Sequence, residues 1–140
     1  MTPSIPPIEK KRSNYMLDIY IFYDHLNSDK ERTLTGYRYS GGKSKPQQVF
    51  HILVNDPLMW NPEKDGIMPL FLHSLDVAPG HETLAPIGLV YLIKYARKRG
   101  YPAILATGKS STISEQEAEN MLLAAGFRKL NHRRYWMNLA

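Results

Sequence analysis

The segment Gly108-Lys109-Ser110 is the first candidate for chemistry in this chain, because it follows a predicted strand as the end of a phosphate-binding P-loop does. The complete signature also requires a glycine five residues before Gly108, and Ala103 stands there, inside the predicted strand. The chain has no Gly-x-Ser-x-Gly elbow either, so no serine is indicated as a nucleophile. These residues therefore predict neither a P-loop nor a serine nucleophile.

The histidines are the next candidates, as metal ligands. None of the five has a partner at a ligand spacing such as His-x-x-x-His. The chain contains no cysteine, which excludes disulfides, thiolate metal sites and cysteine nucleophiles. We therefore expect no metal site. Surface or hydrogen-bonding roles are expected for His25, His51, His73, His81 and His132.

Basic and aromatic residues alternate near the C-terminal end, in Arg128-Lys129 and in the run 132–136, His-Arg-Arg-Tyr-Trp. Such interleaving suits contact with a phosphate backbone and stacking on bases. The formal net charge of +5, from 18 Lys and Arg against 13 Asp and Glu, favours acidic partners. In a terminal hairpin the same alternation places polar residues outside and aromatic residues inside. A basic nucleic-acid-binding module is therefore one alternative hypothesis.

The composition is that of a globular protein. A chain of 140 residues suits one domain with a single core, and its 43% hydrophobic and 22% charged residues lie in the ordinary range. No apolar run approaches the roughly 20 residues that span a bilayer. The N-terminus lacks the apolar segment of a secretory signal. We expect a soluble protein that is cytoplasmic or virion-associated.

Residues 1–13 combine three prolines with Glu9-Lys10-Lys11-Arg12, a composition typical of a mobile arm. If such an arm is ordered, something must hold it, either the fold itself or a neighbouring chain. We therefore expect residues 14–140 to form the domain. The arm could then contact a protein partner or another chain of an assembly.

The first half of the domain is predicted to contain two strands and a helix. Residues 14–23 and 33–39 are rich in β-branched and aromatic residues, as strands are, and would pair in a hairpin or meander. In the segment 46–54, Val49, Ile52 and Leu53 follow the three-four spacing of one helical face, so we predict a helix there. A polar loop over residues 61–66 follows.

The second half is predicted to alternate strands and helices. Gly100 should end the first helix, and Gly126 the second, which Ser114 and Glu117 start with a capping box. The strands on either side of the first helix should lie parallel. The predicted order is strand 70–77, helix 84–99, strand 101–107, a helix from Ser114, strand 127–130 and strand 134–139.

Three landmarks accompany this order. Val77-Ala78-Pro79 closes the first of these strands, Ala118 lies in the second helix, and Gly126-Phe127 ends that helix. Residues of these types at these places resemble the acyl-CoA-binding half of the GNAT superfamily of N-acetyltransferases. The resemblance covers roughly residues 70–136. It implies an α/β fold with a GNAT-like mixed twisted sheet, a parallel central strand pair and flanking helices.

The resemblance also implies where acetyl-CoA would bind. In the family, N–H groups of a glycine-rich loop and of the following helix hold the pyrophosphate, because orphan donors and the helix dipole together attract anions. Carried onto this chain, the backbone of Leu75 and Val77 would orient the thioester. The cofactor-binding positions at the helix start would be Thr83, Ala85, Ile87 and Gly88.

The loop departs from the family pattern of Arg or Gln followed by glycines. Depending on the register, Glu82 or Thr83 stands at the basic position, and Pro86 or Ile87 replaces a glycine. Pro86 has no N–H to donate, Ile87 adds bulk, and the Glu82 carboxylate would repel a phosphate. The segment is therefore either a plain helix cap or an acyl-CoA site with unusual chemistry.

The catalytic positions implied by the resemblance are also altered. The family places a proton-donating tyrosine four residues before the Gly-Phe glycine, and Leu122 stands there, which cannot act as a general acid. Tyr135 and Tyr101 are alternatives whose positions the sequence does not give. A general base could be Asp76 or a water molecule. No catalytic residue is predicted.

Three functional hypotheses follow. The first is a divergent, degenerate GNAT-like protein that serves as a non-catalytic binding or structural module. Short phage-encoded proteins of similar outline extend this hypothesis to a virion-associated role. The second is an active N-acetyltransferase that uses acetyl-CoA on an amine substrate. The third is the nucleic-acid-binding module.

Overall fold

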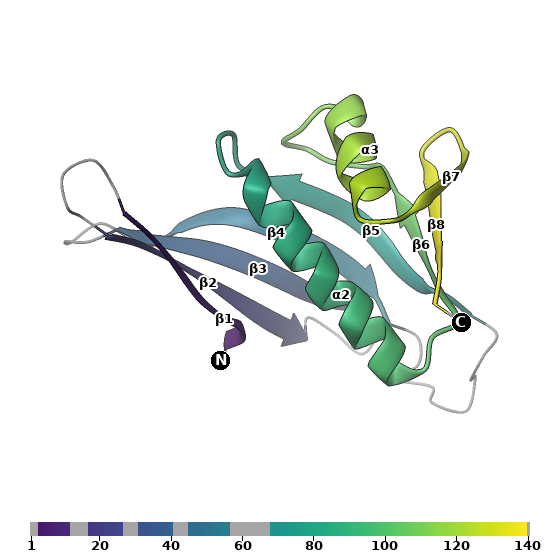
Figure 1. Ribbon diagram of the computed structural model, residues 1–140, viewed down its shortest axis with the longest axis horizontal. Helices are drawn as coiled ribbons and strands as arrows, with labels where there is room; N and C mark the ends of the chain where they lie inside the picture. The colour runs from purple at the N-terminus through teal and green to yellow at the C-terminus, as the bar shows by residue number, and fades with distance from the viewer. Residues whose placement is uncertain (1–2, 12–16, 27–30, 41–44, 57–67, 140) are drawn as a thin grey trace.

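A single sheet runs through the computed structural model, which describes residues 3–11, 17–26, 31–40, 45–56 and 68–139 (Figure 1). Within these residues the strand order is β1-β2-β3-β4-β5-β6-β8-β7. The strands are β1 (Pro3–Lys11), β2 (Leu17–Leu26), β3 (Glu31–Ser40), β4 (Gln47–Asn55), β5 (Leu70–Val77), β6 (Ala103–Thr107), β7 (Arg128–Asn131) and β8 (Arg134–Asn138). The helical elements are the 3₁₀ turn η1 (Glu82–Leu84), α2 (Ala85–Arg99) and α3 (Glu115–Ala124).

The sheet is mostly antiparallel and contains one parallel pair. β5 and β6 pair in parallel, from Leu70 opposite Ile104 to Leu72 opposite Ala106, whereas the other neighbours are antiparallel. α2 joins the parallel strands, because such strands need a crossover connection. The predicted mixed α/β fold with one parallel strand pair is confirmed.

The signals that end the helices act as predicted. Gly100 follows α2 in the left-handed conformation with a φ of 88°. Ser114 begins α3 by accepting a hydrogen bond from the Glu117 N–H at 3.1 Å. Gly126 follows α3 with a φ of 104°. The predicted strand over 70–77 is β5, and the two predicted C-terminal strands form the β7–β8 hairpin.

The helix predicted over 46–54 is wrong, because this segment forms the strand β4. Phe50, Ile52 and Val54 are buried in alternation, so the segment also carries the two-residue period of a strand. Pairing with β3 on one side and β5 on the other satisfies its backbone. The three-four spacing of its apolar residues therefore reflects a strand that is apolar on both faces.

The predicted N-terminal arm contributes an edge strand. β1 pairs antiparallel with β2, and its register shifts between Pro3 and Ile5 and again between Ile5 and Ile8. Ile5 and Ile8 pack against the core, so the fold itself holds this segment. Proline suits an edge strand, because its missing N–H faces away from the sheet. The predicted strand 14–23 corresponds to β2, its first three residues and the predicted loop 61–66 lying outside the described residues.

The core lies between the sheet and the two helices, which cover the same face (Figure 1). α2 comes closest to the sheet at Gly88, where an added Cβ would lie 2.3 Å from the Phe50 Cζ. Gly88 is therefore required for the contact between helix and sheet. Fully buried large side chains of the core include Phe22, Phe50, Ile52, Leu70, Leu72, Leu75, Leu84, Leu89, Ile104 and Leu122.

Replacing Gly88 with alanine should destabilise the protein, although alanine is the better helix former. The clash with the Phe50 ring should cost about 1 to 3 kcal/mol, more than the roughly 1 kcal/mol gained in helix propensity. Urea unfolding measures the change in free energy. In a Phe50→Leu background, which removes the ring, the same substitution should be neutral or stabilising. An equal cost in both backgrounds would show that the ring does not cause it.

Candidate functional site

The parallel strands β5 and β6 separate after Leu72 and Ala106, and the segment 108–113 then follows the edge of β5. The Leu75 N–H donates to the Lys109 carbonyl at 3.0 Å. The Val77 N–H donates to Thr112 Oγ1 at 2.8 Å. The two backbone donors expected to orient a thioester are thus engaged by the chain itself.

Asp76, the candidate general base, is held by the same segment. Its Oδ1 accepts hydrogen bonds from the Ser111 N–H at 2.7 Å, from Ser110 Oγ at 2.9 Å and from Ser111 Oγ at 3.0 Å. All three of these bonds engage one carboxylate oxygen of Asp76 and come from two residues of the 108–113 segment. Asp76 therefore fixes the 108–113 segment beside β5.

The start of α2 satisfies its own donors. The Leu84 N–H donates to the His81 carbonyl at 3.0 Å, and the Ala85 N–H donates to the Glu82 carbonyl. The Glu82 carboxylate accepts a hydrogen bond from the Gly80 N–H at 3.1 Å. Backbone N–H groups of Glu82 itself and of Gly80 lower the pKa of this carboxyl. The turn that leads into α2 therefore already holds a carboxylate from the chain itself.

The four predicted cofactor-binding positions at this helix start differ in exposure. Ala85 is fully buried, and Gly88 is buried against Phe50. Ile87 is half-buried and packs against the core, while Thr83 is exposed. Gly88 therefore serves the packing of the helix against the sheet.

A groove of about 490 Å³ runs between the start of α2 and α3. Its walls are mostly apolar, and the charged residue among those that line it is Glu82. A phosphate in this groove would meet a carboxylate and no cation from its described lining. The lining includes Thr83, Pro86, Val90, Asn120, Met121 and Ala124.

The candidate proton donors lie apart from one another. Leu122 is fully buried in the core, as its place on the helix predicts. The Tyr135 hydroxyl donates to Glu119 Oε1 at 3.0 Å, and burial raises the pKa of Tyr135. The Tyr101 hydroxyl donates to Asp56. Tyr101 precedes the first residue of β6, whereas the 108–113 segment follows the last residue of that strand. The two tyrosine hydroxyls are thus engaged by carboxylates, Tyr135 by Glu119 and Tyr101 by Asp56.

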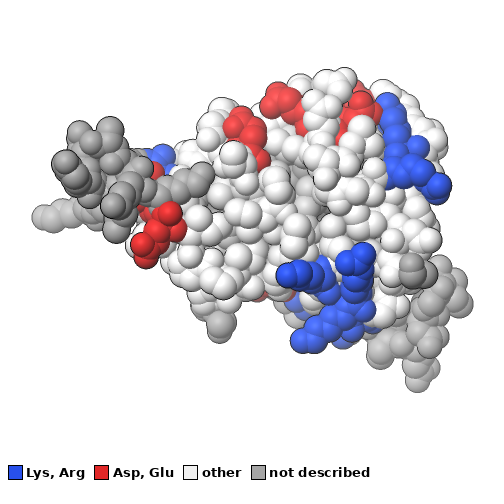
Figure 2. Space-filling view, viewed as in Figure 1, with Lys and Arg blue, Asp and Glu red and all other residues white. Residues whose placement is uncertain are grey.

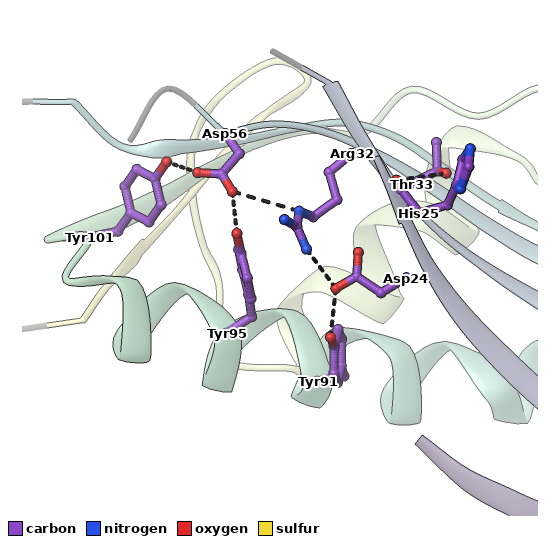
Figure 3. Close-up of polar contacts among 8 residues, drawn as sticks. All are labelled: Asp24, His25, Arg32, Thr33, Asp56, Tyr91, Tyr95 and Tyr101. Atoms are coloured by element: carbon purple, nitrogen blue, oxygen red, sulfur yellow. Dashed lines mark hydrogen bonds and ion pairs between the residues drawn. The ribbon is translucent and has the colours of Figure 1, made fainter. Parts of the chain in front are cut away.

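The sequence did not indicate a second polar cluster, which lies between the sheet and α2 (Figure 3). Asp56 is fully buried and accepts hydrogen bonds from the Tyr95 and Tyr101 hydroxyls. Arg32 lies between two carboxylates, with Nε 3.7 Å from Asp56 Oδ2 and Nη1 2.9 Å from Asp24 Oδ2. We call Asp24, Arg32, Asp56, Tyr91, Tyr95 and Tyr101 the buried polar cluster.

The buried polar cluster ties α2 to β2, to β3 and to the residue that follows β4. The Tyr91 hydroxyl donates to Asp24 Oδ2 at 2.7 Å, and the Arg32 guanidinium lies 4.8 Å from the centre of the Tyr95 ring. Burial raises the pKa of Tyr91 to about 12 and raises that of Tyr95 further, and hydrogen bonds to the carboxylates add to both shifts. The two phenols therefore stay protonated, as hydrogen-bond donors must.

The cations of the C-terminal hairpin are paired with α3. Lys129 Nζ lies 2.6 Å from Glu119 Oε1, and Arg133 Nε lies 3.2 Å from Glu115 Oε1. The hydrogen bond with Glu119 raises the pKa of Lys129. Tyr135 is buried, as expected for the inner side of a hairpin. Part of the predicted basic and aromatic surface is thus used within the fold.

The described residues contain no group of three or more His, Cys, Asp or Glu side chains that could hold a metal ion. None of their helices is long and apolar enough to cross a membrane.

Comparison of the chain with protein-family models, curated proteins and solved structures gives no match.

Only a few short sequence features could have predicted the contacts of the 108–113 segment and of the buried polar cluster. Ser110, Ser111 and Thr112 are typical side-chain donors in turns, which gives the Gly108-Lys109-Ser110 segment a structural reading. Tyr91 and Tyr95 lie four residues apart on α2, so their hydroxyls point to one side of the helix. The strand registers that bring carboxylates to these tyrosines have no local signal.

Removing the Asp56 carboxylate should strongly destabilise the fold. Asp56→Ala removes the acceptor of the buried Tyr101 phenol and of the half-buried Tyr95 phenol, and it also removes one partner of Arg32. Breaking a buried charged pair costs about 3 to 5 kcal/mol. Tyr101→Phe removes one hydrogen bond and should cost about 1 to 2 kcal/mol. Urea unfolding of both variants gives the comparison. A smaller loss for Asp56→Ala than for Tyr101→Phe would contradict the central position of Asp56.

Stability should fall as the pH rises above about 10. The folded chain keeps the Tyr91 and Tyr95 protons where the unfolded chain, with a tyrosine pKa near 10, has released them. Because the native state then binds more protons, the free energy of unfolding decreases between about pH 10 and 12. Urea midpoints across this window measure the slope. A Tyr91→Phe/Tyr95→Phe variant with an unchanged slope would exclude these two groups.

Proposed function

We propose that this chain is a GNAT-like protein that retains the acetyltransferase scaffold without an open acyl-CoA site and serves as a non-catalytic binding or structural module. One observation carries the proposal. The Leu75 and Val77 N–H groups donate to Lys109 and Thr112 of the same chain. An acyl-CoA thioester would have to displace both of these hydrogen bonds.

Three structural features support the proposed GNAT-like scaffold. The parallel pair β5–β6 is joined by α2, in keeping with the acyl-CoA-binding half of the family. β5 ends at Val77, the first residue of the Val-Ala-Pro landmark. Phe127, the second residue of the Gly-Phe landmark, is buried directly after α3.

The helix start supports the loss of phosphate binding. Just before α2, Glu82 already supplies a carboxylate to the Gly80 N–H, and the adjoining groove has no cation in its described lining. Pro86 removes a further donor. A pyrophosphate would therefore meet repulsion at the place where the family provides attraction.

The groups available for proton transfer support a non-catalytic role. Leu122 has no ionisable group, and the Tyr135 hydroxyl donates to Glu119. Asp76 accepts three hydrogen bonds from Ser110 and Ser111. Neither a free acid nor a free base stands at the β5 edge among these candidates.

Acetyl-CoA should leave the melting temperature of the purified chain unchanged. A ligand that binds the native state at 100 times its dissociation constant would stabilise it by about 2.7 kcal/mol, a shift that differential scanning fluorimetry detects. Free CoA and an unrelated nucleotide serve as control ligands. A saturable rise with acetyl-CoA, together with CoA release on an amine substrate, would instead establish the acetyltransferase alternative.

A matched variant tests whether the 108–113 segment acts as a removable lid. Thr112→Ala frees the Val77 N–H and should cost about 1 kcal/mol of stability through the lost hydrogen bond. Under the proposal it gains no affinity for acetyl-CoA, because Glu82 and the Lys109 carbonyl still occupy their donors. Binding that appears only in Thr112→Ala would mean that a functional site lies beneath the segment.

A further inference from the structure

A second groove lies between β1 and α2 and has a volume of about 510 Å³. It shares Pro86 and Val90 with the groove between α2 and α3, so the two grooves flank the same turns of the helix. We call the second one the β1–α2 groove. Its apolar lining comprises Ile5 and Pro6 from β1 and Pro86, Ile87, Val90 and Tyr91 from α2.

The spacing of the lining residues makes the β1–α2 groove elongated. Pro86, Val90 and Lys94 follow one another at intervals of four, which places them in one row along α2. Because an α-helix rises 1.5 Å per residue, this row is about 12 Å long. β1 forms the opposite wall, and its register shifts on both sides of Ile5, as in a strand that bends. The groove therefore suits an extended chain better than a compact ligand.

The walls of the β1–α2 groove are mostly hydrocarbon. Val90 is 49% exposed although it is aliphatic, and Ile5, Ile87 and Tyr91 are half-buried. The Tyr91 hydroxyl donates to Asp24, so its polar atom is already engaged. Small-molecule sites typically measure about 300 to 1,000 Å³ and are apolar with a few polar groups. The β1–α2 groove has the volume and the lining of this class of site.

Lys94 supplies a charge to the described lining and lies at one end of the row along α2. It is exposed, and in the part of the chain that the structure describes no carboxylate forms an ion pair with it. The helix dipole favours Arg97, Lys98 and Arg99 in the last turn, but Lys94 precedes that turn. Figure 2 shows Lys and Arg gathered over the second half of α2, next to a wide uncharged surface. One end of an apolar groove thus attracts an anion.

We propose that the β1–α2 groove binds a single-chain anionic amphiphile, a long-chain carboxylate, with its alkyl chain along the row and its head group at Lys94. Charge complementarity selects this ligand class, because a neutral hydrocarbon would not use Lys94 and nucleic acid needs cations along its whole length. The described lining includes no residue of the β5 edge or of the 108–113 segment. The inference therefore goes beyond the proposed function and does not depend on the closure of that edge.

Displacement of a fluorescent fatty acid, dansyl-undecanoic acid, measures the binding of unlabelled carboxylates to the full chain below their micelle concentrations. Each buried methylene strengthens binding by about fourfold, so decanoate should bind about sixteenfold more tightly than octanoate. Methylenes beyond the length of the groove should add little. Decanoate should also bind about twofold to fivefold more tightly than decanol, because an exposed ion pair such as that with Lys94 contributes at this level.

Two substitutions on α2 separate the head-group contact from a general effect of charge. Lys94→Gln should abolish the preference for decanoate over decanol and leave the binding of decanol unchanged. Lys98→Gln is the matched control, because it removes the same charge from the same helix at a position outside the described lining. It should keep the preference for decanoate.

Val90→Glu tests the apolar wall, because a carboxylate in the groove should weaken the binding of decanoate and of decanol by about tenfold or more. Asn120→Glu places the same charge in the groove between α2 and α3 only and should leave both ligands unaffected. Folding is checked by the melting temperature of each variant without ligand. If Val90→Glu lowers it, Val90→Gln decides, because glutamine favours a helix and still removes the apolar surface. It should also weaken both ligands.

Several outcomes would overturn the proposal. These are the absence of saturable displacement, equal affinities for octanoate and decanoate, or a loss of carboxylate preference in Lys98→Gln that equals the loss in Lys94→Gln. Sedimentation of the chain with anionic phospholipid vesicles that Val90→Glu abolishes, without binding of free decanoate, would assign the groove to a membrane surface. A thermal shift with acetyl-CoA would contradict the proposed function and leave the binding of decanoate as it is.

Discussion

The contact between α2 and the sheet is the constraint on which the rest of the structure depends. Near its first turns α2 meets the sheet through Gly88, with the Phe50 ring in the space that a side chain would fill. Further along, Tyr95 reaches the buried Asp56 carboxylate. A missing side chain and a buried charge thus hold the same helix by different means, close packing at one end and hydrogen bonds at the other. Because α2 joins β5 to β6, its position also fixes how these strands run.

Strands that separate must have their backbone groups satisfied by something else. After Leu72, β5 has no β6 residue opposite it in the ladder, and donors left without a partner here would be costly. In an acyl-CoA-binding protein a ligand can supply the acceptors. In this chain the acceptors are the Lys109 carbonyl and the Thr112 hydroxyl, and Asp76 anchors the segment that carries them. The closure of the β5 edge therefore depends on the backbone and side chains of one short segment.

Predictions from sequence succeeded where the signal is local. Gly100 and Ser114 mark helix ends because the left-handed conformation and the side-chain cap each involve only nearby residues. The helix prediction for the segment 46–54 failed because its apolar spacing fits both a helix and a strand that is apolar on two sides. Only the pairing with β3 and β5 makes the segment a strand. The buried polar cluster could not be predicted, because Asp24 in β2 and Asp56 just after β4 are far apart in the sequence and both reach α2. At the candidate site, the sequence identified Leu75, Val77 and Asp76 but not the segment 108–113 that binds them.

Apolar residues on both faces of a strand obscure its two-residue period. β2 places Phe22 toward the helices and Ile21 away from them, and β4 does the same with Ile52 and Leu53. Strands of this kind are typical of sheets covered on both faces, such as parallel sheets between helix layers or the inner sheets of sandwiches. The described part of the chain provides helices for one face only. The other face mixes apolar residues such as Leu53 with polar ones such as Thr35 and His51. Apolar residues on both faces therefore blur the two-residue period of a strand without making the second face apolar, and this is why the segment 46–54 can be mistaken for a helix.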